Sequence, residues 1–190
     1  MRTRERIVGH ATDLASVEGL EGITIGRLAS DLEMSKAGVI GQFGNKETLQ
    51  LAATAEAERI FRGMVLEPTK DEKPGLTRLL AICDTWIDYV ASQTFAGGCF
   101  WEAASVEMDG REGPVRDAIA ASLDAWYGLL EREAGLAIKR GEIDPGVDAE
   151  QLVFELRSLI TGLNTEIQMR GNPNAPERAR RAMRRVLGVT

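Results

Sequence analysis

A short stretch near the N-terminus, residues 34–46, combines hydrogen-bond donors with an absence of acidic residues. Lys36 and Gln42 carry an ammonium group and an amide, which have the donors to reach acceptors on the edges of bases. Ser35 and Lys46 offer a hydroxyl and a second ammonium group, and both suit phosphate oxygens. This combination indicates a surface that binds a negatively charged partner rich in hydrogen-bond acceptors.

Residues suited to catalysis or metal binding are few. His10 is the single histidine, and Cys83 and Cys99 are the only cysteines. Their spacing matches neither a zinc site nor a disulfide framework, and the sequence has no Gly-rich phosphate loop. Cys99 stands at a predicted helix start, where a redox sensor is one interpretation and a buried inert cysteine the simpler one. We expect no enzyme activity, no metal and no cofactor.

The composition, rich in Ala, Leu, Glu and Arg, favours an all-α fold of about nine helices. Hydrophobic periodicity places them at residues 3–18, 25–32, 36–42, 46–65, 75–92, 98–108, 113–140, 147–170 and 175–187. Thr24 and Ser35 have the chemistry of N-caps for the second and third helices. These two helices are too short to stand alone, so they must pack against the first and the fourth.

The segment Thr24–Phe43 resembles a helix-turn-helix. Ala29 is small enough to let its two helices approach, and Val39 packs beneath the second helix. The spacing puts Ser35, Lys36, Ala37, Gly38 and Gln42 on or near the open face, where a major groove would lie.

The longer run ITIGRLASDLEMSKAGVIGQFGNKETL is similar to the pattern of the TetR family of transcriptional regulators. A Thr-capped helix and a turn lead into a recognition helix that ends in Phe43, and Lys46, Glu47 and Leu49 start the next helix. The rest of the chain matches only in helix number and length. The resemblance implies an N-terminal three-helix DNA-binding domain and a C-terminal domain for ligand sensing and dimerisation.

We expect contacts with double-stranded DNA from Arg4, Thr24, Arg27, Ser35, Lys36, Ala37, Gly38, Gln42 and Lys46. For Arg4 and Arg27, a solvated position is an equal alternative. Glu33 departs from the family pattern, which commonly has Gly in the turn; a left-handed conformation there costs on the order of 1 kcal/mol. Ile40 replaces an aromatic residue, usually Tyr, whose hydroxyl reaches the DNA backbone, so Ile40 is not among the expected contacts.

The formal net charge of −6 is concentrated in the C-terminal body. Residues 63–169 hold nine Lys and Arg against 19 Asp and Glu, whereas residues 1–46 hold six of each. The charged stretch 67–75, which contains two prolines, is the best linker. We expect a DNA-binding domain at 1–65 and a ligand-binding and dimerisation domain at 66–190.

The last two predicted helices carry apolar stripes, and the first stripe is too wide for one neighbouring helix to cover. The resemblance implies a four-helix interface between two protomers. The expected interface residues are Leu152, Leu156, Leu159, Leu163, Ile167, Ala179 and Met183. The last helix is also rich in Arg; a solvated face is favoured over binding of nucleic acid or an anionic membrane.

Aromatic residues gather in the helices that the resemblance assigns to the sensor. Trp86, Tyr89, Phe100, Trp101, Met108 and Trp126 are the expected ligand-binding residues. They suit an apolar or aromatic small molecule, and the alternative is that they only fill the core.

Together these features favour a cytoplasmic, ligand-responsive regulator, and we expect a repressor that an effector releases from a palindromic operator. The alternative is a helical protein-interaction module without sequence-specific DNA binding, although such a module would not require the acid-free stretch 34–46. We expect neither a signal peptide nor a membrane span, because no run of about 18 apolar residues occurs.

Overall fold

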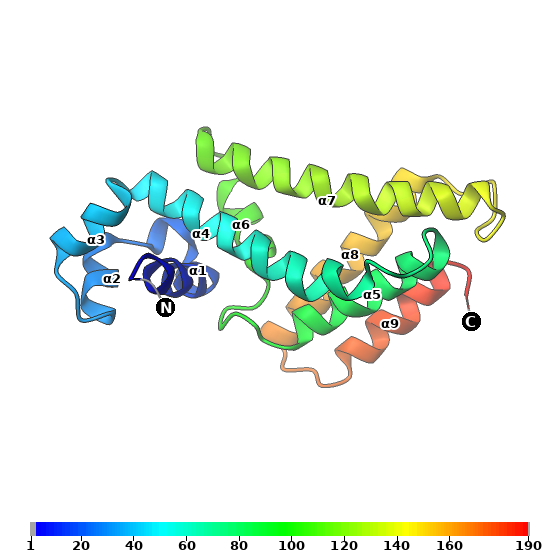
Figure 1. Ribbon diagram of the computed structural model, residues 1–190. Coiled ribbons are helices and arrows are strands. Elements are labelled where there is room, and N and C mark those ends of the chain that lie inside the picture. Colours follow the sequence, from blue (N-terminus) through cyan, green and yellow to red (C-terminus); the bar gives the residue numbers. More distant parts are fainter. Residues whose placement is uncertain (1–2, 190) are drawn as a thin grey trace. The chain divides into compact units, whose positions relative to one another are not determined.

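The computed structural model describes residues 3–189 and confirms the all-α class (Figure 1). In this range the chain forms nine α-helices and no strand. They are α1 (Thr3–Gly22), α2 (Ile25–Asp31), α3 (Lys36–Phe43), α4 (Lys46–Phe61), α5 (Leu76–Ala91), α6 (Phe100–Met108), α7 (Pro114–Lys139), α8 (Ala149–Gln168) and α9 (Ala175–Val186). A π-helical turn, η1 (Arg62–Leu66), and a 3-10 turn, η2 (Glu67–Thr69), follow α4. None of the described helices is long and apolar enough to cross a membrane.

The chain folds as two compact units. The first unit holds the residues up to Ile60 together with 93–122, so it contains α1 to α3, most of α4, α6 and the start of α7. The second unit holds Phe61–Ser92 and the residues from Leu123 onward. Compactness thus assigns α6 to the same unit as the helix-turn-helix. The functional division at residue 65 remains a prediction.

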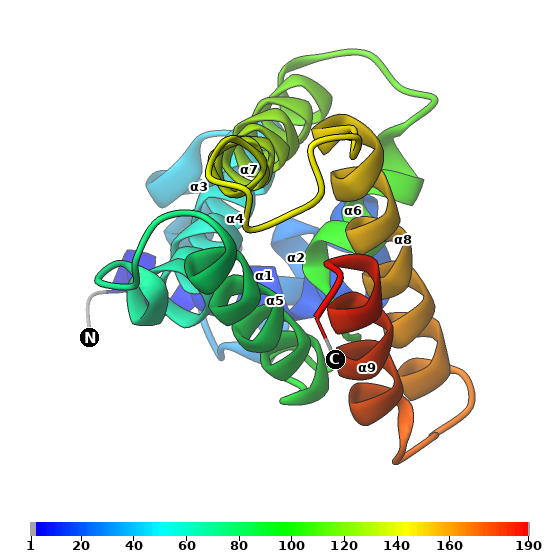
Figure 2. The ribbon, with the colours of Figure 1, turned by 90° about the vertical axis from the view of Figure 1, so that its right-hand side faces the viewer.

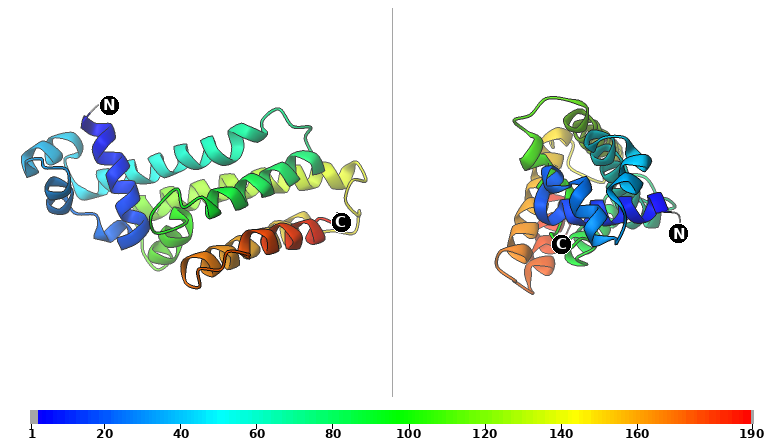
Figure 3. Two further views of the ribbon diagram at one scale, coloured as in Figure 1. Left: turned by 90° about the horizontal axis from the view of Figure 1, so that it is seen from below. Right: turned by 90° about the vertical axis from the view of Figure 1, so that its left-hand side faces the viewer.

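In the first unit, α6 and the loop before it are attached to α1 (Figure 3). The backbone N–H of Gly97 donates to Ser16 Oγ at 3.0 Å, and that of Ala96 donates to Asp13 Oδ1 at 3.1 Å. A side chain at Gly97 would place its Cβ 1.8 Å from the Ser16 carbonyl oxygen, so only glycine permits this approach. The loop is therefore held tightly against α1.

In the second unit, α8 and α9 form a helical hairpin that packs on α5 (Figure 2). Apolar residues of the three helices, among them Ile82, Leu156 and Met183, are fully buried between them. At the edge of this core, Arg180 of α9 forms ion pairs with Asp84 and Asp88 of α5. The amphipathic pattern of these helices is thus satisfied largely within the chain.

Candidate nucleic-acid interface and sensor cluster

The two helices of the helix-turn-helix, α2 and α3, begin at the predicted caps. Thr24 Oγ1 accepts a hydrogen bond from the backbone N–H of Arg27 at 3.1 Å. Ser35 Oγ accepts one from the N–H of Gly38 at 3.0 Å. Each hydroxyl satisfies a backbone donor at a helix start, and each keeps its own O–H group to donate to a phosphate. The caps thus fix where both helices begin.

The turn between these helices contains the left-handed conformation that costs free energy for a residue other than glycine. Glu33 has φ 55°, in the left-handed region, and the chain turns with a hydrogen bond of 2.8 Å from the N–H of Met34 to the carbonyl oxygen of Ala29. Leu28 of α2 and Val39 of α3 are completely buried. The packing of α3 on its neighbours therefore orients the opposite face toward solvent.

The open face of α3 presents the residues expected to read bases. Lys36, Ala37 and Gln42 are exposed, and Gly38 is half-buried. Ile40 is also on the surface, with 45% of its area exposed. No acidic side chain lies within α3 itself. This face therefore combines donors, small residues and one large apolar side chain.

Arg27, one of the residues expected to contact DNA, already has acidic partners within the first unit. Arg27 Nε donates to Asp31 Oδ2 at 2.7 Å, and the same guanidinium reaches Glu18 at 3.0 Å. The hydrogen bond to Asp31 raises the pKa of Arg27. Hydrogen bonds from His10 and then from Arg27 lower the pKa of Asp31. Arg27 therefore has to share or exchange partners in order to meet a phosphate.

Lys46 and Arg4 are placed in similar ways. Lys46 Nζ donates to the carbonyl oxygen of Glu21 at 2.7 Å and to its carboxylate at 3.0 Å. This hydrogen bond from Lys46, followed by one from Gln50, lowers the pKa of Glu21. The Arg4 guanidinium lies 5.0 Å from the ring centre of Phe43, over the end of α3. Lys46 thus joins α4 to α1, and Arg4 joins α1 to the end of α3.

The C-terminal turn of α1 is bonded to α6. At Gly19, φ 78° and ψ 167° interrupt the helix, which frees backbone N–H groups. Glu107 of α6 accepts hydrogen bonds from two of them, Leu20 at 2.6 Å and Glu21 at 2.8 Å. Glu107 is therefore a cap for the broken end of α1.

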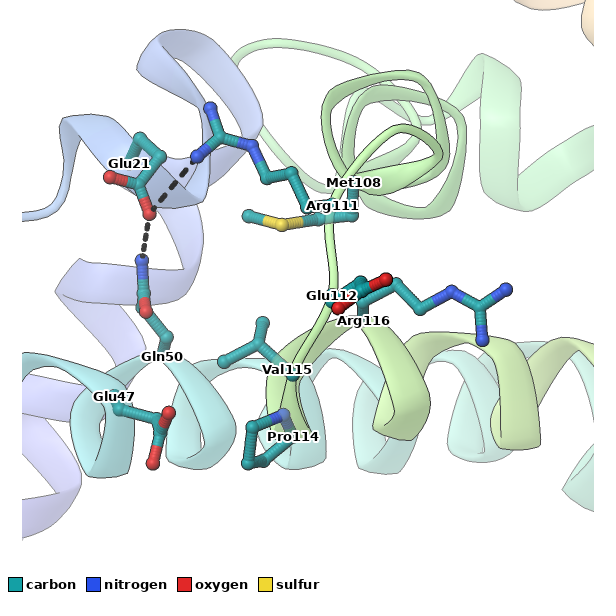
Figure 4. A pocket seen from close by; sticks show the side chains of 10 residues that line it. Glu21, Glu47, Gln50, Met108, Arg111, Glu112, Pro114, Val115 and Arg116 are labelled. Atoms are coloured by element: carbon teal, nitrogen blue, oxygen red, sulfur yellow. Dashed lines mark hydrogen bonds and ion pairs between the residues drawn. The ribbon is translucent and has the colours of Figure 1, made fainter.

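A polar cleft of about 210 Å³ lies beside this junction (Figure 4). Its lining includes Glu21, Gln50, Met108, Arg111 and Arg116. Arg111 reaches the Glu21 carboxylate at 3.8 Å. Because charged groups dominate this lining, the cleft does not match the apolar site expected around Met108.

The second unit contains an aromatic cluster that includes three of the expected ligand-binding residues. Trp86 and Trp126 meet edge to face at 4.9 Å between ring centres. Phe61 contacts Trp126 at 4.9 Å and Tyr89 at 5.2 Å, also edge to face. We call Phe61, Trp86, Tyr89 and Trp126 the sensor cluster. Trp126 is 8% exposed, and its buried Nε1–H has no hydrogen-bond acceptor among the described residues.

The other three expected ligand-binding residues belong to α6 in the first unit. Phe100 and Trp101 pack edge to face at 5.5 Å, and Phe95 joins them at 6.1 Å from Phe100. Met108 is buried at the end of α6. Each unit therefore has an aromatic group of its own.

Comparison with known proteins identifies the fold. Residues 75–183 match the family model of the tetracycline-repressor-like C-terminal domain. The chain belongs to the tetracycline-repressor-like, or TetR, family. It is therefore a ligand-responsive, DNA-binding transcriptional regulator, and regulators of this family are homodimers that generally lack enzymatic activity. A search of curated proteins gives no match.

Solved structures superimpose over nearly the whole chain. A TetR transcriptional regulator from Chloroflexus aurantiacus is 26% identical, with a TM-score of 0.86 over 95% of this chain and 91% of its own. AibR, in complex with isovaleryl coenzyme A and operator DNA, is 24% identical, with a TM-score of 0.77 over 99% and 98%. A regulator from Saccharomonospora viridis in complex with choline is 19% identical, with a TM-score of 0.80 over 97% and 95%.

The residues expected at the TetR dimer interface lie mostly within the core of the single chain, and their role in dimerisation remains a prediction. Leu152, Leu156, Leu163, Ala179 and Met183 are buried inside a single chain, where they have little surface to offer a partner. The remaining two, Leu159 and Ile167, are half-buried. The wide stripe on α8 is covered by α9 and α5 of the same chain.

Sequence reasoning missed two residues that the structure makes prominent. Phe61 joins the sensor cluster from the end of α4, and its four-residue spacing from the buried Ala57 and Ala53 was the signal for it. Glu107 gave no such signal, because its partners lie more than 80 residues earlier in the chain.

Proposed function

We propose that this TetR-family chain is a repressor, that its dimer binds a palindromic operator, and that a small effector releases it. The observation that supports this best is α3 itself, a helix with a capped start and a buried side formed by Val39 and Phe43, on which Lys36 and Gln42 are exposed. Such donors bind guanine and adenine edges in the major groove, and Thr24, Ser35 and Lys46 suit the flanking phosphates. We place the protein in the cytoplasm with the DNA, and without enzyme activity.

The test is selection of operator DNA. Purified protein is mixed with a genome-derived fragment pool at near-physiological salt, and the retained fragments are sequenced. We expect an enriched palindrome that is lost when Lys36 and Gln42 are both changed to Ala. The control Lys139→Ala removes one exposed positive charge from the second unit and should retain the palindrome. Weak binding without sequence preference, from a folded dimer, would contradict the proposal and favour a protein-interaction module.

For the effector, we propose an apolar or aromatic molecule that carries a hydrogen-bond acceptor and binds at the sensor cluster. The aromatic rings of the cluster provide apolar walls. The buried Trp126 Nε1–H supplies a donor whose desolvation costs free energy until an acceptor meets it. Related folds were solved with an acyl thioester and with choline, so the fold itself admits both acceptors and cations, and this donor favours the acceptor.

Three probes of similar size distinguish these chemistries: benzoate, benzamide and benzyltrimethylammonium. We expect the first or second to quench tryptophan fluorescence and weaken operator binding, and we expect Trp126→Phe to reduce the effect. Release by the ammonium compound alone would overturn the acceptor chemistry. If no probe binds, a wider set of acceptor-bearing compounds decides the effector class, and the operator result stands independently.

A further inference from the structure

The most outward face of α3 is almost free of side chains. Val39 and Phe43 point into the first unit, and at 100° per residue the opposite side of the helix is formed by Ala37, Gly38 and Gly41. A Cβ added at Gly41 would meet no atom within 4 Å, so the face is open there, whereas a Cβ at Gly38 would lie 3.2 Å from Ser35 Oγ. A helix with so small an outer face approaches the floor of a groove closely, because no long side chain holds its backbone away.

Ile40 and Gln42 lie on opposite flanks of this small face. Gln42 has an amide, whereas Ile40 has a purely aliphatic side chain. This side chain is 45% exposed to solvent. Its β-branch restricts χ1, so the side chain holds one direction with little loss of entropy on binding. Ile40 stands beside a face of small residues, so its exposed surface is far smaller than the broad apolar patches that bind protein partners.

We infer that Ile40 reads the methyl group of a thymine in each operator half-site. The C5 methyl of thymine is the one apolar group that base pairs present in the major groove. With the backbone of α3 close to the groove floor, Ile40 contacts this methyl on one flank while Gln42 bonds a base edge on the other. Sequence reasoning set Ile40 aside because it cannot replace a tyrosine hydroxyl on phosphate. Its apolar surface instead gives specificity, and this inference rests on the proposed operator binding.

The test removes the methyl group from the DNA rather than from the protein. Each thymidine of the selected operator is replaced in turn by deoxyuridine, which pairs in the same way but lacks the C5 methyl. For the wild-type protein we expect about fourfold weaker binding at one position in each half-site, the effect of exposing roughly one methyl-sized group. Replacement in both half-sites together should weaken binding roughly 15-fold.

The variant Ile40→Ala changes both protomers, so it should bind the unmodified operator with a loss of affinity similar to that of replacement in both half-sites. It should also become insensitive to deoxyuridine at that one position. Ile40→Val, which keeps the β-branch, should give an intermediate loss. Val106→Ala is the matched control, because Val106 is an exposed aliphatic residue of the same unit outside α3; it should retain full sensitivity. Circular dichroism and thermal unfolding establish that the variants are folded, which the exposure of Ile40 leads us to expect.

The outcomes separate this inference from the proposed function. Operator binding that is insensitive to every deoxyuridine, or a sensitivity that Ile40→Ala leaves unchanged, overturns the role of Ile40 while the regulator stands. Failure to select any operator overturns the proposed function itself. A sensitivity that disappears in Ile40→Ala at the same position in both half-sites establishes the contact.

Discussion

Thr24 and Ser35 were predictable because a cap acts over three residues. Each hydroxyl accepts the backbone N–H three positions ahead, so the residue type and the start of an apolar period suffice to identify it. Lys46 shows the opposite case. Its partner Glu21 lies on another helix, and no local pattern shows that this cation is already paired. The residue-level prediction of DNA contacts was therefore better founded for the caps than for the charges.

Glu33 gives the first prediction, because it holds φ 55° without the freedom of glycine. Replacing it with Gly removes a left-handed strain of about 1–2 kcal/mol and adds unfolded-state entropy of about 0.4–1 kcal/mol. We expect Glu33→Gly to raise the free energy of unfolding by roughly 0.5 kcal/mol, measured by urea denaturation. Glu33→Ala is the control, since it removes the charge but keeps the Cβ and so retains the strain. Equal stability changes in both variants would contradict this account.

Helix bounds were largely predictable, whereas the faces that the helices bury were less so. The predicted range 36–42 agrees closely with α3, because Ser35 and Gly44 mark its ends. The stripe on α8 was identified correctly as apolar but assigned to a partner protomer. Periodicity shows only that a face is buried; here α9 and α5 of the same chain cover it. Which element covers a stripe depends on tertiary packing that periodicity does not contain.

The junction of α1 and α6 gives a prediction at the scale of elements. Glu107 is the acceptor for two N–H groups at the break in α1. Glu107→Ala leaves both without this partner, and we expect a loss of about 1–2 kcal/mol in the free energy of unfolding, with partial exposure limiting the effect. Because α1 packs against α2, operator binding should also weaken.

Urea denaturation and operator titration measure these two effects. Glu107→Gln keeps one carbonyl acceptor and should fall between the wild type and Glu107→Ala. Glu112→Ala serves as the control, because this exposed carboxylate is on the loop that follows α6. If Glu107→Ala is as stable as the control variant, the cap at the break contributes nothing to holding α6 on α1.

At the scale of the whole molecule, reading a palindrome requires two protomers, and the outward face of α8 is the surface we propose between them. Phe154 is 53% exposed there, and Ser158, Thr161, Gly162 and Thr165 follow it at helical spacing, all of them small and exposed. The Arg157 guanidinium lies over the Phe154 ring at 5.4 Å. Small residues beside one aromatic residue let two helices pack closely, and the symmetry of a homodimer makes the same face available twice.

Substitutions on this face should separate the two protomers and therefore also their two recognition helices, α3. We expect Phe154→Glu and Gly162→Glu each to shift the dimer toward monomer in sedimentation velocity, because each introduces a charge twice into the proposed interface, once from each protomer. Operator affinity should then fall at least tenfold, since the second half-site no longer binds within the same complex. Val106→Glu is the control, an apolar position on α6 that is 75% exposed, and it should remain dimeric. A dimer that survives both α8 substitutions would assign the interface to another face. A monomer that keeps full operator affinity would instead show that one α3 suffices for binding, so that the palindrome is not read by symmetry.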